Sequence, residues 1–304
     1  MNITTPVLTG DRTSMSISLD DGRKLSFAEY GPENGKPFIL FHGSPGSRIS
    51  EDHPLLYKLG IRMIYPERPG YGQSSPYPNA SFRSWSEDVA SLIKHLKIDT
   101  ASIGGVSGGG PYALACAALI PGKVETLSLI ASAAPADIPG YKENMALSNK
   151  MGYIINKYTP FLVRWVSQNF AKNLRKHPYK TIKQINQQLC PSDQNILDDM
   201  EKNGGMEVII EHLNEAFANG VDGHVKDMAL FTKKWNLPYE KITCPVHIWH
   251  GEEDTLAPLP GIKALSQLLL NVQENVIPNA GHLLMEDEKI FKLMLESIKT
   301  YETD

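Results

Sequence analysis

The sequence is poor in cysteine and lacks the cysteine spacings that bind metal ions or form disulfide frameworks. Its 304 residues include only Cys116, Cys190 and Cys244, and no C-x-x-C pair occurs. Because the number is odd and the separations are wide, we expect neither a disulfide framework nor a thiolate metal site. The three side chains are expected to be reduced thiols in packed positions.

Long apolar runs and a strong excess of one charge are also missing. No stretch is long enough to span a bilayer, and the first residues, MNITTPVLTGDRTS, lack the apolar segment of a secretory signal. The formal net charge of −4 gives no reason to expect nucleic acid, or an anionic membrane surface that attracts clustered Lys and Arg. We therefore expect a cytoplasmic protein with a small-molecule substrate, no nucleic-acid partner and no membrane partner. The sequence carries no signal for the oligomeric state.

What the sequence does contain is an alternation of strand and helix patterns. The segments PFILFHG and IRMIYPE are short apolar runs bounded by turn residues, which is typical of buried strands. The later segment SFRSWSEDVASLIKHLKI has apolar residues at helical spacing, with Ser81 or Ser84 as its capping residue. The alternation predicts an α/β fold with a mostly parallel sheet covered on both faces.

The pattern changes after about Pro135. From there to about Leu237 only helical spacing occurs, and the strand–helix alternation returns with the next apolar run. An insertion of this kind between two strands of one sheet does not interrupt the core. We therefore predict one core domain made of residues 1–135 and 238–304, with a helical cap formed by residues 136–237.

An aromatic and aliphatic stripe lies in the first half of this insertion. We expect it to form the inner face of a cap helix pair and to line an apolar pocket, because ligand sites are mainly apolar. A membrane-surface patch is the alternative that the same pattern allows. The stripe comprises Tyr153, Ile154, Tyr158, Phe161, Leu162, Trp165 and Phe170.

The segment Gly105-Val106-Ser107-Gly108-Gly109 matches G-x-S-x-G between a predicted strand and a predicted helix. A serine on such a sharp turn projects from the sheet, and glycine two residues away on each side avoids steric clashes. The following helix directs N–H groups to the same place, where they stabilise negative charge. A plain glycine-rich turn shares the pattern, whereas a phosphate-binding Walker A loop would need a Gly-Lys-Ser/Thr ending. We predict that Ser107 is a nucleophile.

A serine hydroxyl needs a base to remove its proton, and the base needs an acid to orient it. In a site built on such a turn the chain order is serine, acid, histidine, and only His282 follows the last candidate acid loop. Glu252, Glu253 and Asp254 all lie in that loop. We favour Asp254, because its shorter side chain loses less rotamer freedom and the loop can turn back there. Asp137, after an earlier strand, is the alternative acid.

Two backbone N–H groups are expected to stabilise a developing oxyanion. The N–H of Gly108, directly after the nucleophile, is the first donor. The second is expected from the loop that follows the strand PFILF, where Ser44 is the candidate because Pro45 has no N–H. The neighbouring His42 is expected to pack structurally near this loop.

A metal site is not expected in the histidine-rich strand VHIWH. His247 and His250 are three residues apart on this strand and therefore point to opposite faces of the sheet. One cation could not easily bind both of them. The chemistry of a serine nucleophile with a histidine base also requires no cofactor, so none is expected.

Five motifs, in this order, resemble the α/β-hydrolase fold superfamily: HGSPGS, ERPGYGQS, GVSGGG, HGEEDTLAP and NAGH. The match covers about Ser16–Pro135 and Thr243–Thr300. The resemblance implies an α/β-hydrolase core with a mostly parallel sheet and a helical cap insertion. It also implies that the acid is Asp254, in the H-G-x-x-D loop, and that the H-G-x-P loop supplies an oxyanion donor at Ser44. Members with Asp as nucleophile hydrolyse epoxides or haloalkanes, and Ser107 argues against both.

The expected function is that of a serine hydrolase. We expect cleavage of a small, largely apolar carboxylic ester, lactone or thioester through an acyl-enzyme intermediate on Ser107. In this reaction His282 transfers the proton and Asp254 orients His282. Alternatives within the same fold are an aminopeptidase-like amidase, lyase chemistry, and ligand binding for signalling without turnover, because a fold and a triad do not determine the reaction.

Overall fold

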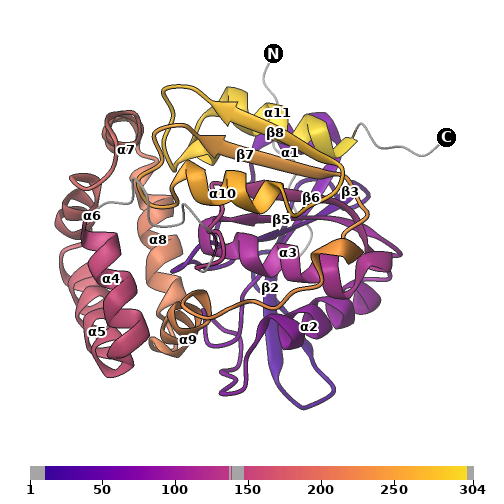
Figure 1. The fold of residues 1–304 in the computed structure, drawn as a ribbon, viewed down its shortest axis with the longest axis horizontal. Helices are drawn as coiled ribbons and strands as arrows, with labels where there is room; N and C mark the ends of the chain where they lie inside the picture. The colour runs from indigo at the N-terminus through magenta and orange to yellow at the C-terminus, as the bar shows by residue number, and fades with distance from the viewer. Residues whose placement is uncertain (1–10, 137, 139–146, 300–304) are drawn as a thin grey trace.

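A single sheet lies at the centre of the molecule, whose computed structural model describes residues 11–136, 138 and 147–299. The strands are β1 (Met15–Ser18), β2 (Lys24–Tyr30), β3 (Lys36–Phe41), β4 (Ile61–Pro66), β5 (Ala101–Val106), β6 (Val124–Ile130), β7 (Val246–Gly251) and β8 (Val272–Ile277). Among these residues the sheet has eight strands in the order β1-β2-β4-β3-β5-β6-β7-β8 (Figure 1). β1–β2 and β2–β4 pair antiparallel, and all other neighbours pair parallel. The predicted mostly parallel sheet is confirmed.

Helices cover both faces of this sheet. They are α1 (Pro54–Leu59), α2 (Phe82–His95), α3 (Gly110–Leu119), α10 (Leu259–Ser266) and α11 (Glu288–Lys299). In β3, Ile39 and Phe41 point to a buried cluster shared with α2, α3 and α10, whereas Phe38 and Leu40 point to a cluster shared with α1 and α11. This is the alternation that a strand buried on both faces requires. None of the helices that the structure describes is both long enough and apolar enough to cross a bilayer.

The two helices beside the central strands form for different local reasons. α2 begins with a capping box, in which Ser81 and Ser84 exchange side-chain and backbone hydrogen bonds. Its buried face carries Trp85, Val89 and Leu92 at helical spacing. α3 follows the predicted nucleophile and is built mainly from small apolar residues, so it packs closely between α2 and the sheet and is buried almost throughout.

Six helices in the described residues lie between β6 and β7, where the sequence predicted a helical insertion. They are α4 (Leu147–Tyr158), α5 (Pro160–Lys176), α6 (Pro178–Asn186), α7 (Pro191–Asn203), α8 (Met206–Ala216) and α9 (Asp222–Phe231). Figure 1 shows them stacked at one end of the sheet. They have a buried apolar cluster of their own, which Tyr71 joins from the core. We call α4–α9 the inserted helices.

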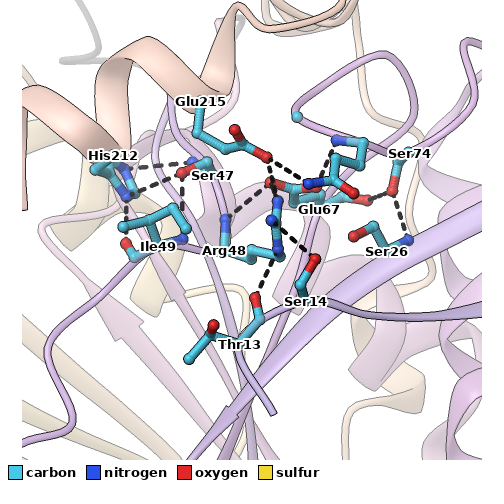
Figure 2. A network of polar contacts seen from close by, with 12 residues as sticks. Thr13, Ser14, Ser26, Ser47, Arg48, Ile49, Glu67, Ser74, His212 and Glu215 are labelled. Atoms are coloured by element: carbon cyan, nitrogen blue, oxygen red, sulfur yellow. Dashed lines mark hydrogen bonds and ion pairs between the residues drawn. The ribbon is translucent and has the colours of Figure 1, made fainter. Parts of the chain in front are cut away.

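A buried polar network fastens the inserted helices to the loops that follow β3 and β4 (Figure 2). Arg48 pairs with Glu67 at 2.9 Å and also with Glu215 of α8. His212, one turn earlier on α8, contacts the carbonyl of Ile49 at 2.8 Å through Nδ1. Because the Glu67 side chain is fully buried, loss of Arg48 would leave an uncompensated charge. The network therefore holds α8 in a defined position over the core.

The predicted inward orientation of the aromatic stripe is wrong for most of its residues. Phe170 does pack against Phe217 in the buried cluster of the inserted helices, and the side chain of Tyr153 lies outside the described part of the chain. Tyr158, Phe161 and Trp165 are exposed rather than directed toward the core. α5 instead buries a face of smaller residues, which allows close packing against α8 and α9: Val163, Ser167, Ala171 and Leu174. The physical reason is that α5 has apolar residues on two faces. The face with the smaller side chains allows α5 to approach the neighbouring helices more closely than the aromatic face would.

Candidate active site

Ser107 sits on a strained turn between β5 and α3. Its φ angle is +53°, in the left-handed region that non-glycine residues rarely adopt. A short 3-10 turn, η1 (Ser107–Gly109), leads directly into α3. A Cβ atom on Gly105 would lie 2.3 Å from the carbonyl oxygen of Gly109, so only glycine fits there. The strand–turn–helix context that the sequence predicted for Ser107 is present.

Asp254 and His282 are in direct contact. Asp254 follows β7 and His282 follows β8, and the Nδ1 atom of His282 lies 2.7 Å from Oδ2 of Asp254. The other carboxylate oxygen, Oδ1, accepts hydrogen bonds of 2.8 Å from the N–H groups of Leu256 and Ala257. Both side chains of the pair are buried. Asp254 is thus fixed from one side by backbone and holds the imidazole from the other.

The electrostatics of this pair favour a charged carboxylate and a more basic imidazole. Burial by itself would raise the pKa of Asp254, but the attraction and hydrogen bond of His282, with smaller contributions from His250 and the N–H of Ala257, outweigh it, so the pKa lies below its usual value. Burial would lower the pKa of His282, whereas Asp254 and, to a smaller extent, Asp193 raise it, and the net pKa is raised. His282 therefore accepts a proton more readily than a histidine in water.

The two other acids of the Asp254 loop face solvent. Glu252 and Glu253 are exposed at the exit of β7, as expected for a solvated loop. Asp137, the alternative acid on the earlier strand, lies outside the described residues.

The loop after β3 packs directly against the turn that carries Ser107. A Cβ atom on Gly43 would lie 3.5 Å from Cβ of Ser107, and one on Gly108 would lie 2.5 Å from Oγ of Ser44. The two residues predicted to donate to the oxyanion, Ser44 and Gly108, are therefore neighbours. His42 is fully buried behind this loop, and its Nε2 accepts a hydrogen bond from the backbone of Arg68, which is the structural position expected for it.

Sequence reasoning missed Asp227 of α9, which anchors this loop. Its carboxylate accepts hydrogen bonds from Ser44 Oγ at 2.5 Å, from Arg68 at 2.8 Å, and from the hydroxyls of Tyr71 and Tyr112 at 2.8 and 2.5 Å. The side chains of Arg68 and Asp227 are almost completely buried. Arg68 also donates to the carbonyl of Gly43 and to Ser44 Oγ. Asp227 thus couples an inserted helix to the predicted oxyanion loop.

Sequence reasoning also missed Asp193, near the start of α7. Its Oδ2 and Oδ1 atoms accept hydrogen bonds from the backbone N–H groups of His282 and Leu283, at 2.8 and 2.9 Å. Asp193 is fully buried, and a Cβ atom on Gly281 would lie 2.3 Å from its Oδ2. The glycine before His282 therefore gives the carboxylate room to approach. No local signal links residues 89 positions apart, so the sequence alone could not reveal this contact.

The contact between Ser107 and His282 that the sequence predicted is not made in this structure. Among the described residues, no hydrogen bond joins Ser107 Oγ to His282. Such contacts are often long before substrate binds and tighten in the complex. The parallel strands β5, β7 and β8 nevertheless end at the same edge of the sheet, so Ser107, Asp254 and His282 all lie on loops at that edge. Within the part of the chain that is described, no three His, Cys, Asp or Glu side chains cluster as metal ligands would.

Comparison with known proteins assigns this architecture to a family. A family model described as alpha/beta hydrolase fold matches residues 36–289. The chain belongs to the α/β-hydrolase fold family. The resemblance predicted from the five sequence motifs is confirmed, and the match extends across the inserted helices of this α/β-hydrolase.

Individual relatives of this α/β-hydrolase are distant. A non-heme chloroperoxidase of Streptomyces lividans is 24% identical over 248 residues, covering 80% of this chain and 83% of the relative. Lipase 1 of Psychrobacter immobilis is 24% identical, covering 93% and 84%. Among solved structures, the enol-lactonase from Burkholderia xenovorans LB400 has a TM-score of 0.66 and 17% identity, covering 93% of this chain and 99% of that chain. At these identities the solved structure shows the fold alone.

Proposed function

We propose that this α/β-hydrolase is a serine hydrolase with Ser107 as nucleophile, His282 as base and Asp254 as acid. The observation that carries the proposal is the 2.7 Å contact between Asp254 and His282. It lies at the same edge of the sheet as a serine whose φ of +53° turns it out of a strand. Structural ion pairs also occur between buried carboxylates and histidines, but they do not require a strained serine at the same edge of the sheet.

The proposed reaction is acyl transfer to water. With Nδ1 of His282 donating to Asp254, Nε2 is free to accept the proton of the Ser107 hydroxyl as the oxygen attacks the substrate carbonyl. The N–H groups of Gly108 and Ser44 would stabilise the oxyanion. Protonated His282 then gives its proton to the leaving alcohol or thiol. His282 then takes a proton from a water molecule, whose oxygen attacks the acyl carbon. His282 returns this proton to Ser107 Oγ as the acyl–oxygen bond breaks, which releases the carboxylic acid and free Ser107 with no cofactor required.

The proposed substrate is a small, largely apolar carboxylic ester, lactone or thioester. Phe231, at the end of α9, supports an apolar group near the reacting carbonyl, because its ring lies 3.0 Å from the position of a Cβ on Gly108. Two of the relatives carry the names lipase and enol-lactonase, and both names denote cleavage of an ester bond. We further propose that residues 136–237 act as a cap, bordering the site through α7 and α9 rather than through the exposed stripe.

A panel of activated esters, a lactone and a thioester tests this function. Wild type should hydrolyse at least one of them, Ser107→Ala should not, and the surface variant Ser91→Ala on α2 should match wild type. Residual activity of Ser107→Ala above about a thousandth of wild type would contradict the assignment, since the oxyanion hole alone leaves only a small remainder. Labelling of Ser107 by a fluorophosphonate without turnover of any substrate would instead favour ligand binding.

A further inference from the structure

The hairpin formed by α4 and α5 exposes a large apolar surface. On α4 the apolar residues recur at i, i+4, i+7 and i+11 and therefore share one face of the helix. α5 begins two residues after α4 ends and continues this surface with aromatic side chains, of which Phe161 is 71% and Trp165 is 62% exposed. We call the eight residues the α4–α5 patch: Leu147, Met151, Ile154, Tyr158, Phe161, Leu162, Trp165 and Val166.

The segment that carries the patch is also strongly basic. Residues 147–192 contain eight Lys and Arg and no Asp or Glu, within a chain of net charge −4. Lys172 and Lys176 follow Phe161 by 11 and 15 positions, and Trp165 follows it by four, so all four residues lie on one face of α5. Both lysines are exposed. Aromatic and cationic side chains therefore follow one another along the outer face of a single helix.

Cations also lie directly beside the aromatic part of the patch. The ammonium group of Lys157 lies over the ring of Tyr158, 5.1 Å from its centroid. Arg164 extends from the neighbouring turn of α5, where it meets Asp222 of α9 in an exposed ion pair. A long cationic side chain at the border of an apolar surface can cover that surface with its methylene groups while its charge reaches an anion.

We propose that the α4–α5 patch docks onto the surface of an anionic lipid bilayer. Its apolar side chains would enter the boundary between headgroups and acyl chains, and Lys172 and Lys176 would contact anionic headgroups. Tryptophan is enriched at this boundary, and phenylalanine is common on the apolar faces of helices that lie in it. A second copy of the chain suits the patch less well, because a symmetric contact would bring two groups of cations together.

The negative charge of the whole chain does not oppose this docking. Charges separated by more than about 8 Å are largely screened at physiological ionic strength, so a membrane responds to the charge of the face that it meets. The inference rests on the α4–α5 patch and its lysines, and it is independent of the proposed chemistry at Ser107.

The patch contains its own spectroscopic reporter. The chain has four tryptophans, and Trp85, Trp235 and Trp249 are buried, whereas Trp165 is exposed. Addition of vesicles should therefore shift the emission of the wild type to shorter wavelength through Trp165. Trp165→Phe should lose this spectral change while still sedimenting with the vesicles.

The binding experiment compares vesicles of phosphatidylcholine with vesicles that also contain phosphatidylglycerol. Wild type should sediment with the anionic vesicles at low salt and be released by high salt. Lys172→Gln/Lys176→Gln should bind about 30-fold more weakly, the loss expected for two cations at an anionic surface. Phe161→Ser/Trp165→Ser should bind more than about tenfold more weakly. All of these substitutions lie on exposed positions, so the thermal unfolding midpoint should stay near that of wild type.

Matched controls come from exposed residues elsewhere on the surface. Lys58→Gln/Lys263→Gln removes two exposed lysines from α1 and α10, and Leu293→Ser removes an exposed leucine from α11. Both control variants should bind anionic vesicles as wild type does. The proposal would be overturned if wild type bound neutral vesicles as well as anionic ones, or if the two patch variants bound anionic vesicles as wild type does. It would also be overturned if wild type formed a dimer that the patch variants abolish, because a second copy would then occupy the patch.

Discussion

Substitution of Asp193 by Asn tests whether an inserted helix controls the proposed base. The carboxylate of Asp193 accepts the N–H groups of both His282 and Leu283 and is fully buried. Asn keeps one acceptor oxygen but presents an NH2 group to the other N–H. One buried backbone donor is then left without an acceptor, which costs about 1–3 kcal/mol. The free energy of unfolding should fall by this amount.

The same substitution should also change catalysis. Displacement of the His282 backbone by a fraction of an ångström to about 1 Å can lower kcat by up to about 10²-fold. In addition, the negative charge of Asp193 contributes to the raised pKa of His282. The base must be unprotonated to act, so wild-type activity should rise as pH passes upward through the pKa of His282. In the Asp193→Asn variant that pKa falls, and the acidic limb of the kcat/KM profile should move to lower pH.

The assay is hydrolysis of one activated ester across a pH series, with a thermal unfolding curve for each variant. Asp198→Asn, an exposed position on the same helix α7, is the control and should leave both the acidic limb and kcat unchanged. A lower unfolding midpoint in Asp193→Asn with an unmoved acidic limb and a kcat within about twofold of wild type would refute the reasoning. Asp193 would then only fasten the insertion to the core.

Three further variants address the remaining parts of the site. Asp254→Asn should lower kcat by about 10⁴ and shift the acidic limb to lower pH, because the tautomer and the raised pKa of His282 both depend on this carboxylate. The control variant Glu253→Gln should keep kcat within about tenfold of wild type. Comparable losses of kcat in the two variants would contradict the pairing of Asp254 with His282. Asp227→Asn should lower the free energy of unfolding by about 3–5 kcal/mol, since it leaves Arg68 as an uncompensated buried charge. A denaturation midpoint equal to that of wild type would contradict the role of Asp227 in anchoring the loop after β3. Gly108→Ala should lower kcat by about 10²-fold or more, because a Cβ there would lie 2.5 Å from Ser44 Oγ; unchanged kcat would mean that Gly108 is not part of the oxyanion site.

The parts of the molecule that local sequence determines could be predicted. Apolar runs of strand length and the start of α2 lie where the sequence placed them, because each depends on neighbouring residues; of the two candidate capping residues, Ser81 is the N-cap and Ser84 completes a capping box with it. The turn at Ser107 could be anticipated for the same reason, since its glycines lie within two residues of it. The choice of Asp254 over Glu252 and Glu253 also followed from chain geometry within a single loop, and the structure brings Asp254 to His282.

Contacts between distant segments could not be predicted. Asp193 meets the backbone of His282 from 89 positions away, and Asp227 meets Arg68 from 159 positions away. In the sequence both are single acids among other acids of helical segments, with no spacing that distinguishes them. Their role depends on how the inserted helices settle on the core, which is decided by packing rather than by local propensity.

The orientation of α5 shows a second limit of sequence reasoning. Periodicity identified its apolar stripe but not which side of the helix would be buried. The expectation that the bulky side faces inward was wrong, because Val163, Ala171 and Leu174 form a slimmer face that packs on neighbouring helices. The expectation of no membrane partner rested on the lack of a spanning stretch and on the net charge of the whole chain; the proposed docking of the α4–α5 patch departs from it because the segment 147–192 is basic.

Mapping of a covalent adduct shows whether Ser107 is an activated nucleophile. The protein is treated with a fluorophosphonate, digested, and analysed by peptide mass spectrometry. We expect one modified peptide, with the adduct on Ser107, and loss of labelling in Ser107→Ala and His282→Ala but not in Ser91→Ala. An adduct on another serine in the wild type, or undiminished labelling of Ser107→Ala, would contradict this role of Ser107.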